Sequence, residues 1–289
     1  MHKHNSKEQY EENWYWYLTG ENKNGFSPEY ERAVKLYRLI SSPFPGQPRC
    51  FECNRPLSGF GGWLLRTHPS SFSPRLCHTC EQAIREEEAG AEVVVSLLFA
   101  DVRGSTSLAE RYSTTEFKEL IKRFYQTTSQ VLIAHNAMVN RLMGDQVIGL
   151  FAPRFAGSDH AKVAIDVALE LLQATGHSEP QGPWIPVGIG IHTGQAYVGA
   201  VGTKNGVNEI TVLGSAPNLA ARLSSQAAEG EILVSEAAAS SAGLVLENTE
   251  RRELALKGID NPVDTCVLRL DNVKSVGASS TAVRRSSSS

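Results

Sequence analysis

An apolar run in this chain ends in an aspartate and a loop of small residues. The stretch "VVVSLLFADVRGST" is apolar up to Ala100, continues with Asp101, and then contains glycine, serine and threonine. Hard divalent cations bind carboxylate oxygens, and a glycine-containing loop can direct backbone N–H groups at an anion. The stretch therefore suits a metal ion beside phosphates, although an aspartate here can equally cap the following helix.

A second carboxylate lies at the tip of a predicted hairpin. The segments "MVNRLM" and "QVIGLFAP" flank Gly144 and Asp145, a turn pair between two strands. If this hairpin lies beside the strand that delivers Asp101, the two carboxylates meet at one edge of a sheet. Together with the backbone carbonyl of Val102 they would hold one or two Mg²⁺ ions beside a triphosphate. The alternative is that Asp145 only makes a good turn.

Four of the five cysteines form two C-x2-C pairs, Cys50 with Cys53 and Cys77 with Cys80. This pattern is typical of one structural Zn²⁺ held by four thiolates. The segment between the pairs is rich in Gly, Pro and Ser, so it has little core of its own and needs a metal to hold it. Redox-active or merely buried thiols and an iron–sulfur cluster are the alternatives. The fifth cysteine, Cys266, is predicted to be a buried strand residue.

Composition and charge argue against nucleic-acid-binding and membrane-spanning classes of protein. The chain has 289 residues, of which 41% are apolar and 20% charged, as in a soluble globule with room for a large domain and smaller modules. The net charge of −3 gives no general affinity for nucleic acid or membranes. No apolar run is long enough to span a bilayer, and the N-terminus lacks a signal-peptide core. A cytoplasmic location without a membrane span is therefore expected.

Four regions follow from the changes in composition. Residues 1–48 are predicted to form two short helices rich in aromatic side chains, "YEENWYWYL" and "SPEYERAVKLYRLI". Residues 49–90 hold the four-cysteine module and an acidic linker helix. The main domain runs from 91 to 272. The last residues, 273–289, are of low complexity and are expected to be disordered.

The main domain begins with the strand over residues 93–102 and continues with a helix that starts at a capping box formed by Ser113 and Glu116. An apolar stripe at helical spacing is predicted to be core: Phe117, Leu120, Phe124, Val131 and Leu132. The hairpin around Asp145 comes next, and residues 159–175 then form a second helix.

The remaining segments predict another hairpin and a final strand and helix. Residues 185–194 and 195–202 are predicted to be the two strands of the hairpin. Residues 209–213 form a strand that runs into a helix over 215–227. The order β-α-β-β-α-β is that of an α+β, ferredoxin-like sandwich, with helices on one face of an antiparallel sheet.

Four segments in a fixed order make the pattern specific: "FADVRGST", "RLMGDQVIGLF", "VGIGIHTGQAYVGAVG" and "VLGSAPNLAARL". Together they resemble the class III nucleotidyl cyclase catalytic domain, the family of adenylyl and guanylyl cyclases. The resemblance covers about residues 93–270. It implies the ferredoxin-like fold and identifies Asp101 and Asp145 with the family's two metal-binding aspartates, which hold two Mg²⁺ or Mn²⁺ ions per site.

The resemblance also implies roles for other residues. Asn218 matches the asparagine that orients the ribose, and Arg222 matches the arginine that stabilises phosphate charge in the transition state. Their i, i+4 spacing puts both on one face of a helix. Lys257 resembles the lysine that contacts the terminal phosphates. The loop after Asp101 would supply the phosphate cradle with Arg103, Gly104, Ser105 and Thr106. Outside such motifs, an arginine or a lysine is usually a solvated surface charge.

The resemblance also implies that a second copy of the chain is needed for activity. The family's metal-binding aspartates come from one subunit and its Asn/Arg pair from the other. The resemblance therefore implies a head-to-tail homodimer with two active sites at the interface. Every required residue class is present in this chain, so two copies suffice.

The base-reading positions depart in part from the family pattern. Adenine-specific members have a lysine four residues before the second aspartate, and an aspartate or threonine seven before the asparagine. Here these positions are Arg141 and Thr211. Thr211 fits the bacterial adenylyl pattern, whereas Arg141 can donate to adenine N1 or to guanine O6. Pro217 replaces a valine, which the start of a helix tolerates.

We therefore expect an adenylyl cyclase that converts ATP to 3′,5′-cyclic AMP and pyrophosphate. A guanylyl or relaxed-specificity cyclase is one alternative. The other is a non-catalytic nucleotide-binding module regulated through its cysteine site.

Overall fold

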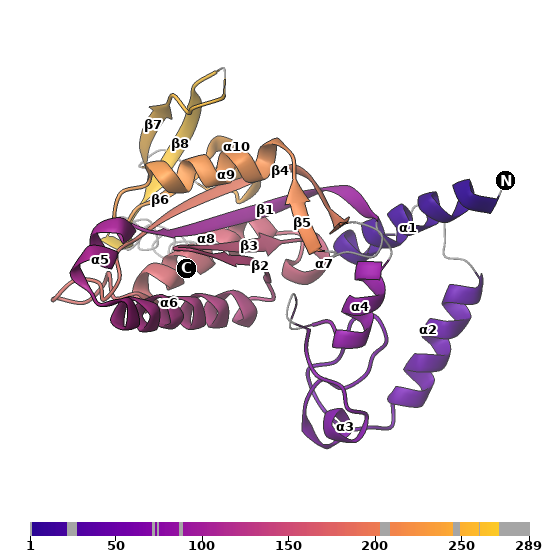
Figure 1. Ribbon diagram of the computed structural model, residues 1–289. Helices are drawn as coiled ribbons and strands as arrows, with labels where there is room; N and C mark the ends of the chain where they lie inside the picture. Colours follow the sequence, from indigo (N-terminus) through magenta and orange to yellow (C-terminus); the bar gives the residue numbers. More distant parts are fainter. Residues whose placement is uncertain are drawn as a thin grey trace, which may run out of the picture.

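The computed structural model describes residues 2–21, 28–70, 73, 75–86, 89–202, 209–244, 249–259 and 261–271. Figure 1 shows a sheet flanked by helices and, at one end of it, a smaller N-terminal part made of helices and loops. The predicted disordered tail, residues 273–289, lies outside the described residues. Within these ranges no helix is long and apolar enough to cross a membrane.

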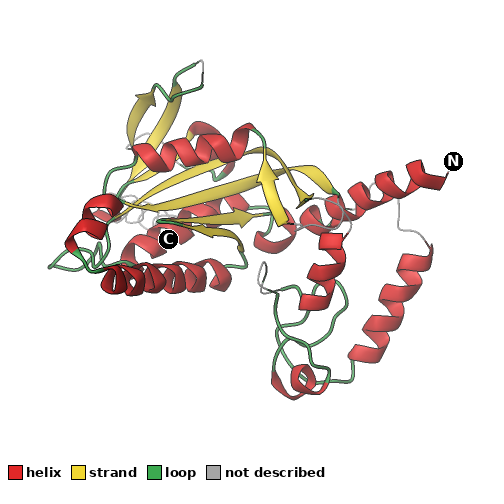
Figure 2. Cartoon of the chain, viewed as in Figure 1, coloured by secondary structure: helices red, strands yellow, loops and turns green. Residues whose placement is uncertain are grey.

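The described strands form one mixed sheet with the order β2-β3-β1-β4-β6-β8-β7, and β5 pairs with β4 beside this path (Figure 2). Among the described strands, only β4 and β6 pair in parallel. The strands are β1 (Gly90–Val102), β2 (Met138–Met143), β3 (Gln146–Phe151), β4 (Val187–Val201), β5 (Glu209–Leu213), β6 (Ile232–Ser235), β7 (Glu250–Leu254) and β8 (Val263–Leu268).

The ferredoxin-like core is confirmed. Strands β1 to β4 lie in the order β2-β3-β1-β4, and two helices make the crossovers, α6 (Thr114–Ala134) after β1 and α8 (His160–Ala174) after β3. The short helix α5 (Ser105–Arg111) follows β1 directly. Strand β1 lies in the middle and is apolar along most of its length because both of its faces are covered. It pairs with β3 on one side and with β4 on the other.

The hairpin predicted over residues 185–202 is wrong. These residues form the single long strand β4, which pairs with β1 from Val187 opposite Val102 to Gly199 opposite Gly90. A glycine within this strand has a packing purpose. A Cβ on Gly190 would overlap the backbone of Ala220 and Ser224 in α9 (Ser215–Gln226), so glycine lets this helix pack directly on the strand.

The expectation that helices cover only one face of the sheet is also wrong. Helices α6, α8 and α10 (Glu236–Ser241) bury side chains against one face, together with Leu98, Ala100 and Val102 of β1. The opposite face, marked by Val95, Leu97 and Phe99, packs against α1 (His2–Thr19) and α9. Helix α9 lies there because small residues, among them Ala216 and Ala220, face the sheet.

The predicted start of α6 is confirmed. The Ser113 hydroxyl accepts from the Glu116 backbone N–H at 3.3 Å, and a Glu116 carboxylate oxygen accepts from the Ser113 N–H at 2.9 Å. Of the predicted apolar stripe, Phe124, Val131 and Leu132 are buried and Leu120 packs against them. Phe117 is different, because it lines a surface cavity instead of the core.

The N-terminal part packs on the far end of β1. Trp14, Tyr17 and Leu18 of α1 are buried in the same cluster as Leu97. The helices predicted near residues 10–18 and 27–40 and the acidic linker helix correspond to α1, α2 (Pro28–Ser41) and α4 (His78–Glu86). The four-cysteine segment adds the short α3 (Gly59–Leu64). Cys266 lies in β8 and is buried, as predicted.

A buried ion-pair cluster fixes the far edge of the sheet. The Glu231 carboxylate, just before β6, accepts from Arg252 of β7 at 2.7 and 2.9 Å and also from Arg269. These bonds, those of Arg252 first, lower the pKa of Glu231 to about 2, and its side chain is only 5% exposed. The cluster therefore ties the β7–β8 hairpin, with Lys257 in its loop, to the body of the sheet.

Glu231→Gln tests this cluster. A carboxyl whose pKa is lowered on folding stabilises the protein above its unfolded pKa and loses that contribution as the pH falls toward the folded value. Near pH 7 we expect the variant to lose about 2 to 3 kcal/mol of unfolding free energy. The difference from the unmodified protein should shrink between about pH 4.5 and pH 2. Urea unfolding across this range measures it. Glu119→Gln, at an exposed side chain, is the control, and an equal loss there would contradict the assignment.

Candidate active site

Asp101 and Asp145 lie at the same end of two neighbouring strands. Asp101 is the penultimate residue of β1 and is opposite Gln146, the first residue of β3. Asp145 directly precedes Gln146, and its backbone carbonyl accepts from the Val102 N–H at 3.0 Å. The structure thus brings together the two carboxylates that the sequence predicted to meet.

The surroundings of Asp101 combine burial with charge. Burial raises the pKa of the Asp101 carboxyl, the neighbouring Arg103 lowers it, and the charge of Asp145 raises it. The Asp101 side chain is 17% exposed, and one of its oxygens forms an ion pair with Arg103. Two half-buried carboxylates that repel each other are a donor set that a hard divalent cation stabilises.

Arg103 is bound within the chain. Besides pairing with Asp101, its guanidinium donates to the carbonyls of Ser225, at 3.2 Å, and Ala227, at 3.4 Å, at the C-terminal end of α9. The sequence placed Arg103 in the phosphate cradle without foreseeing this arrangement. A cation at the end of a helix also interacts favourably with the helix dipole, so Arg103 joins the aspartate to α9.

The other aspartate is held by the same loop. The Ser105 hydroxyl, in the first turn of α5, donates to Asp145. The Tyr125 hydroxyl donates to the Gly144 carbonyl at 2.6 Å and so holds the β2–β3 turn. Gly104 has a positive φ of 64°, a conformation that a residue with a side chain adopts at a cost, and no atom would meet a Cβ there.

A cavity of about 620 Å³ adjoins Asp145. The sequence did not predict this cavity. The only signal for it is the i, i+4 spacing of Lys118 and Lys122, which puts both on one face of α6. Its lining mixes the loop residues with the exposed side of α6: Ser105, Thr106, Ala109, Phe117, Lys118, Ile121, Lys122, Tyr125, Gly144 and Asp145.

Asn218 and Arg222 lie on α9 with exposed side chains. In the part of the chain that the structure describes, neither side chain makes a hydrogen bond or an ion pair. They are therefore not joined to the two aspartates by any contact within this chain. A pair that belongs to a site completed by a second chain would be exposed in this way.

The other predicted contacts lie on three further elements. Thr211 is half-buried in β5, opposite Gly199 of β4. Arg141 lies in β2 opposite Ile148, next to an irregularity in the pairing with β3. Lys257 is exposed in the loop between β7 and β8. No hydrogen bond among the described residues links Thr211 or Lys257 to the aspartates.

The four predicted cysteine ligands come together in the N-terminal part. The sulfur atoms of Cys50, Cys53, Cys77 and Cys80 all lie within 4.8 Å of one another. The Cys77 N–H donates to the Cys50 sulfur at 3.3 Å, as expected for a sulfur with thiolate character. Hydrogen bonds within the cluster, that of Cys53 first, lower the pKa of Cys50. This arrangement is suited to one metal ion.

Comparison with known proteins decides the family. Residues 88–269 match the model of the adenylate and guanylate cyclase catalytic domain, which is more than half of the chain. The chain belongs to the class III nucleotidyl cyclase family. The match includes both aspartates, Asn218 and Arg222, and it excludes the four cysteines.

The chain is similar to adenylate cyclases of two bacteria. It is 31% identical over 134 residues to adenylate cyclase 1 of Rhizobium meliloti, covering 45% of this chain and 20% of that protein. It is 27% identical over 175 residues to an adenylate cyclase of Mycobacterium tuberculosis, covering 59% of this chain and 38% of that protein. The chain thus spans less than two fifths of the length of either relative.

Solved structures support the fold and include cyclases of both kinds. The guanylyl cyclase Cya2 is similar with a TM-score of 0.55 and 25% identity, covering 62% of this chain and 92% of that one. The adenylyl cyclase CyaB from P. aeruginosa has a TM-score of 0.54 and 25% identity, covering 62% and 95%.

Arg103→Gln tests the relation between this side chain and the carboxylates. Because the guanidinium occupies Asp101, a divalent cation at this site must compete with it. We expect the variant to bind Mn²⁺ roughly three to five times more tightly, which corresponds to an ion pair of up to about 1 kcal/mol. Electron paramagnetic resonance of free Mn²⁺ measures this affinity without nucleotide. Arg111→Gln, in the last turn of α5, is the control. Weaker Mn²⁺ binding by Arg103→Gln would mean that the arginine supports the site.

Proposed function

We propose that this protein is an adenylyl cyclase that converts ATP to 3′,5′-cyclic AMP and pyrophosphate. The observation that carries the proposal is the meeting of Asp101 and Asp145 at one sheet edge, beside the loop that opens α5, in a chain of the cyclase family. The adenylate cyclases among its curated relatives support the choice of ATP.

The reaction joins the ribose 3′-oxygen to the α-phosphorus and breaks the bond from that phosphorus to the β-phosphate oxygen. The 3′-hydroxyl loses its proton, and pyrophosphate leaves. When bound, two Mg²⁺ or Mn²⁺ ions acidify this hydroxyl and neutralise the triphosphate. Asp101 and Asp145, with the Val102 carbonyl, are the ligands that would hold them.

The remaining residues bind and orient the nucleotide in this proposal. The backbone from Arg103 to Thr106 faces the phosphates at the start of α5, and Lys257 contacts the terminal ones. Asn218 orients the ribose. Arg222 stabilises charge that grows on the transferring phosphoryl group, a kind of contribution worth roughly 3 kcal/mol or more.

Base selection rests on Thr211 and Arg141. The Thr211 hydroxyl can accept from the adenine amino group, and Arg141 can donate to N1. The second candidate is a guanylyl cyclase, and two observations favour it. An arginine at position 141 can donate equally well to guanine O6, and the structurally similar Cya2 is a guanylyl cyclase.

The four-cysteine cluster is proposed to hold one structural Zn²⁺. Four sulfur donors close together suit tetrahedral zinc. Metal analysis of the purified protein should find one zinc per chain. Iron with visible absorbance would identify an iron–sulfur cluster instead.

The proposed active unit is a head-to-tail homodimer. The exposed, unpaired Asn218 and Arg222 support it, since side chains on the free face of α9 are available to a second copy. Each of the two sites then takes its aspartates from one protomer and its Asn/Arg pair from the other.

Asp101→Asn and Asp145→Asn test the reaction. Each removes one anionic ligand, so we expect at least about a hundredfold loss of cyclic AMP formation from ATP with Mg²⁺ or Mn²⁺. Product analysis by chromatography with ATP and with GTP measures both activities. Asp166→Asn, at an exposed ion pair on α8, should leave them unchanged. If the unmodified protein forms no cyclic nucleotide from either substrate, it is a non-catalytic member of the family.

Mixing two inactive variants tests the shared site. Asp101→Asn combined with Arg222→Ala should recover up to about a quarter of the active sites, because half of the dimers are mixed and each mixed dimer rebuilds one site. Asp101→Asn combined with Asp145→Asn should recover nothing, since both changes affect the same half of the site. Recovery in neither mixture, once subunit exchange is demonstrated, would mean that each site is built within one chain.

A further inference from the structure

A second polar cleft lies in the N-terminal part, away from the two aspartates. It has a volume of about 400 Å³ and lies between the end of α2 and the first cysteine pair. Three of its lining residues are arginines. The full lining is Arg38, Gln47, Arg49, Cys50, Phe51, Asn54 and Arg75.

Arg49 builds the wall of this cleft. Its guanidinium donates to four backbone carbonyls: to Asn54 at 2.9 Å, Phe44 at 2.5 Å, Ser41 at 3.2 Å and Ser42 at 3.4 Å. These bonds join the end of α2 to the turn of the first cysteine pair. All of these acceptors are neutral, so the four bonds hold the Arg49 guanidinium in place without an ion pair to a carboxylate.

Arg75 brings a second fixed cation. Its guanidinium carbon lies 4.5 Å from the centre of the Phe51 ring, a cation–π contact that orients the group. Its Nε atom is buried and has no hydrogen-bond partner. A buried donor on a charged group costs free energy unless an acceptor reaches it. An anion in the cleft would accept from the terminal N–H groups of the same guanidinium, which make no hydrogen bond with the described residues.

Arg38 completes the set from α2, with an exposed side chain. Burial lowers the pKa of Arg154, and the positive charge of Arg38 lowers it further. In the described ranges, no carboxylate pairs with any of the three arginines.

We propose that this cleft binds the phosphate group of a small anion, as a site separate from the catalytic one. Guanidinium groups bind phosphate through paired hydrogen bonds, and Arg75 and Arg38 can offer them. The four terminal N–H groups of Arg49 are already bonded, so Arg49 contributes a fixed positive charge. The donors on Gln47 and Asn54 add neutral hydrogen-bonding capacity. A phosphorylated metabolite and a lipid headgroup share this chemistry.

The cleft also touches the catalytic domain. Phe51, which lies under Arg75, packs against Phe155 of α7 (Pro153–Ala156), with ring centres 5.5 Å apart. The Phe51 carbonyl accepts from Arg154 at 3.4 Å. These residues directly follow β3, the strand that starts next to Asp145. An anion bound in the cleft is therefore one side chain away from the catalytic core.

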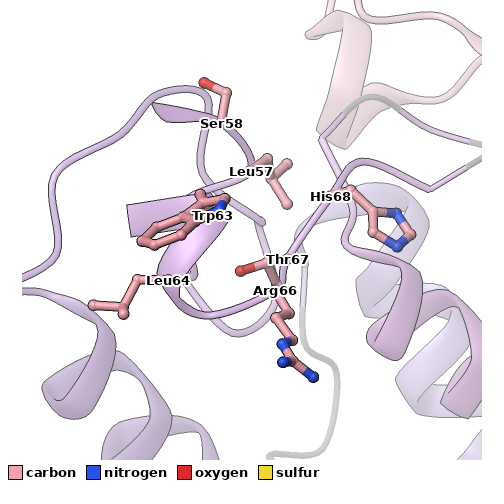
Figure 3. Close-up of a pocket in the computed structure, with 8 residues that line it drawn as sticks. Leu57, Ser58, Trp63, Leu64, Arg66, Thr67 and His68 are labelled. Carbon is pink, nitrogen blue, oxygen red and sulfur yellow. The ribbon is translucent and has the colours of Figure 1, made fainter. Parts of the chain in front are cut away.

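The N-terminal part offers a matched comparison. A larger cleft of about 730 Å³ shares no lining residue with the arginine cleft, and it includes Trp63, Arg66 and His68 (Figure 3). Figure 3 shows the Arg66 side chain extending away from the Trp63 ring. Arg66 is thus an arginine of the same module that lies outside the proposed site.

The test is a titration of the full-length protein with inorganic phosphate. Mg²⁺ and Mn²⁺ are left out, and chloride keeps the ionic strength constant. The Nε–Hε signals of arginine side chains in the NMR spectrum report on binding. We expect the Arg75 signal to shift and saturate. Arg38→Gln, at an exposed side chain, should weaken binding about tenfold, as for the loss of a hydrogen bond to a charged group. Arg66→Gln should leave the affinity unchanged.

Sedimentation with vesicles of phosphatidylcholine and a phosphatidylinositol phosphate distinguishes a lipid headgroup from a free phosphorylated metabolite. Sedimentation that Arg38→Gln abolishes assigns the phosphate to a lipid headgroup, and saturable phosphate binding without sedimentation assigns it to a free anion. Two results overturn the proposal. One is the absence of both saturation and sedimentation. The other is an equal loss in Arg38→Gln and Arg66→Gln. In either case the arginines only balance the charge of the neighbouring thiolates.

Discussion

The pairing of β1 with both of its neighbours is the constraint on which the site depends. Because β1 bonds to β3 on one side and β4 on the other, its register cannot slip without breaking two ladders at once. That register puts Asp101 opposite Gln146 and brings the Val102 N–H to the Asp145 carbonyl. Two carboxylates that repel each other are thus held side by side by backbone bonds that do not depend on their charge.

The position of α9 follows from the same strands. Gly190 lets the helix backbone lie directly on β4, and Arg103 binds the carbonyls at its C-terminal end while pairing with Asp101. One arginine therefore connects the aspartate to the helix that carries Asn218 and Arg222. Those two side chains nevertheless remain exposed and unpaired in the described protomer. The fold thus orders α9 relative to the aspartates while leaving its functional face free for a second copy.

Local signals predicted most of the fold. The capping box at Ser113, the turn at Gly144 and the four cysteines each depend on chemistry a few residues apart, and the structure contains all three arrangements. Predictions failed where the cause lies far away in sequence. Residues 185–202 were predicted to be two strands, whereas they form one, and nothing nearby in sequence shows that α9 packs on Gly190 within it. The contacts of Arg103 with α9 span more than a hundred residues and have no local signal either.

The N-terminal part lies at the ends of β1 and β3 opposite to the aspartates. Helix α4 leads into β1, and α7, which follows β3, contacts both α1 and the cysteine segment through Arg154. The Arg154 guanidinium lies 3.5 Å from the Trp16 ring centre and donates to the carbonyls of Trp16 and Phe51. Burial lowers the pKa of this arginine, and Glu52 at 3.9 Å opposes that effect. A buried, multiply bonded cation tolerates little displacement, since any shift would leave its charge without partners. The module and the catalytic sheet are therefore joined, just beyond the end of β3, by a contact that resists sliding.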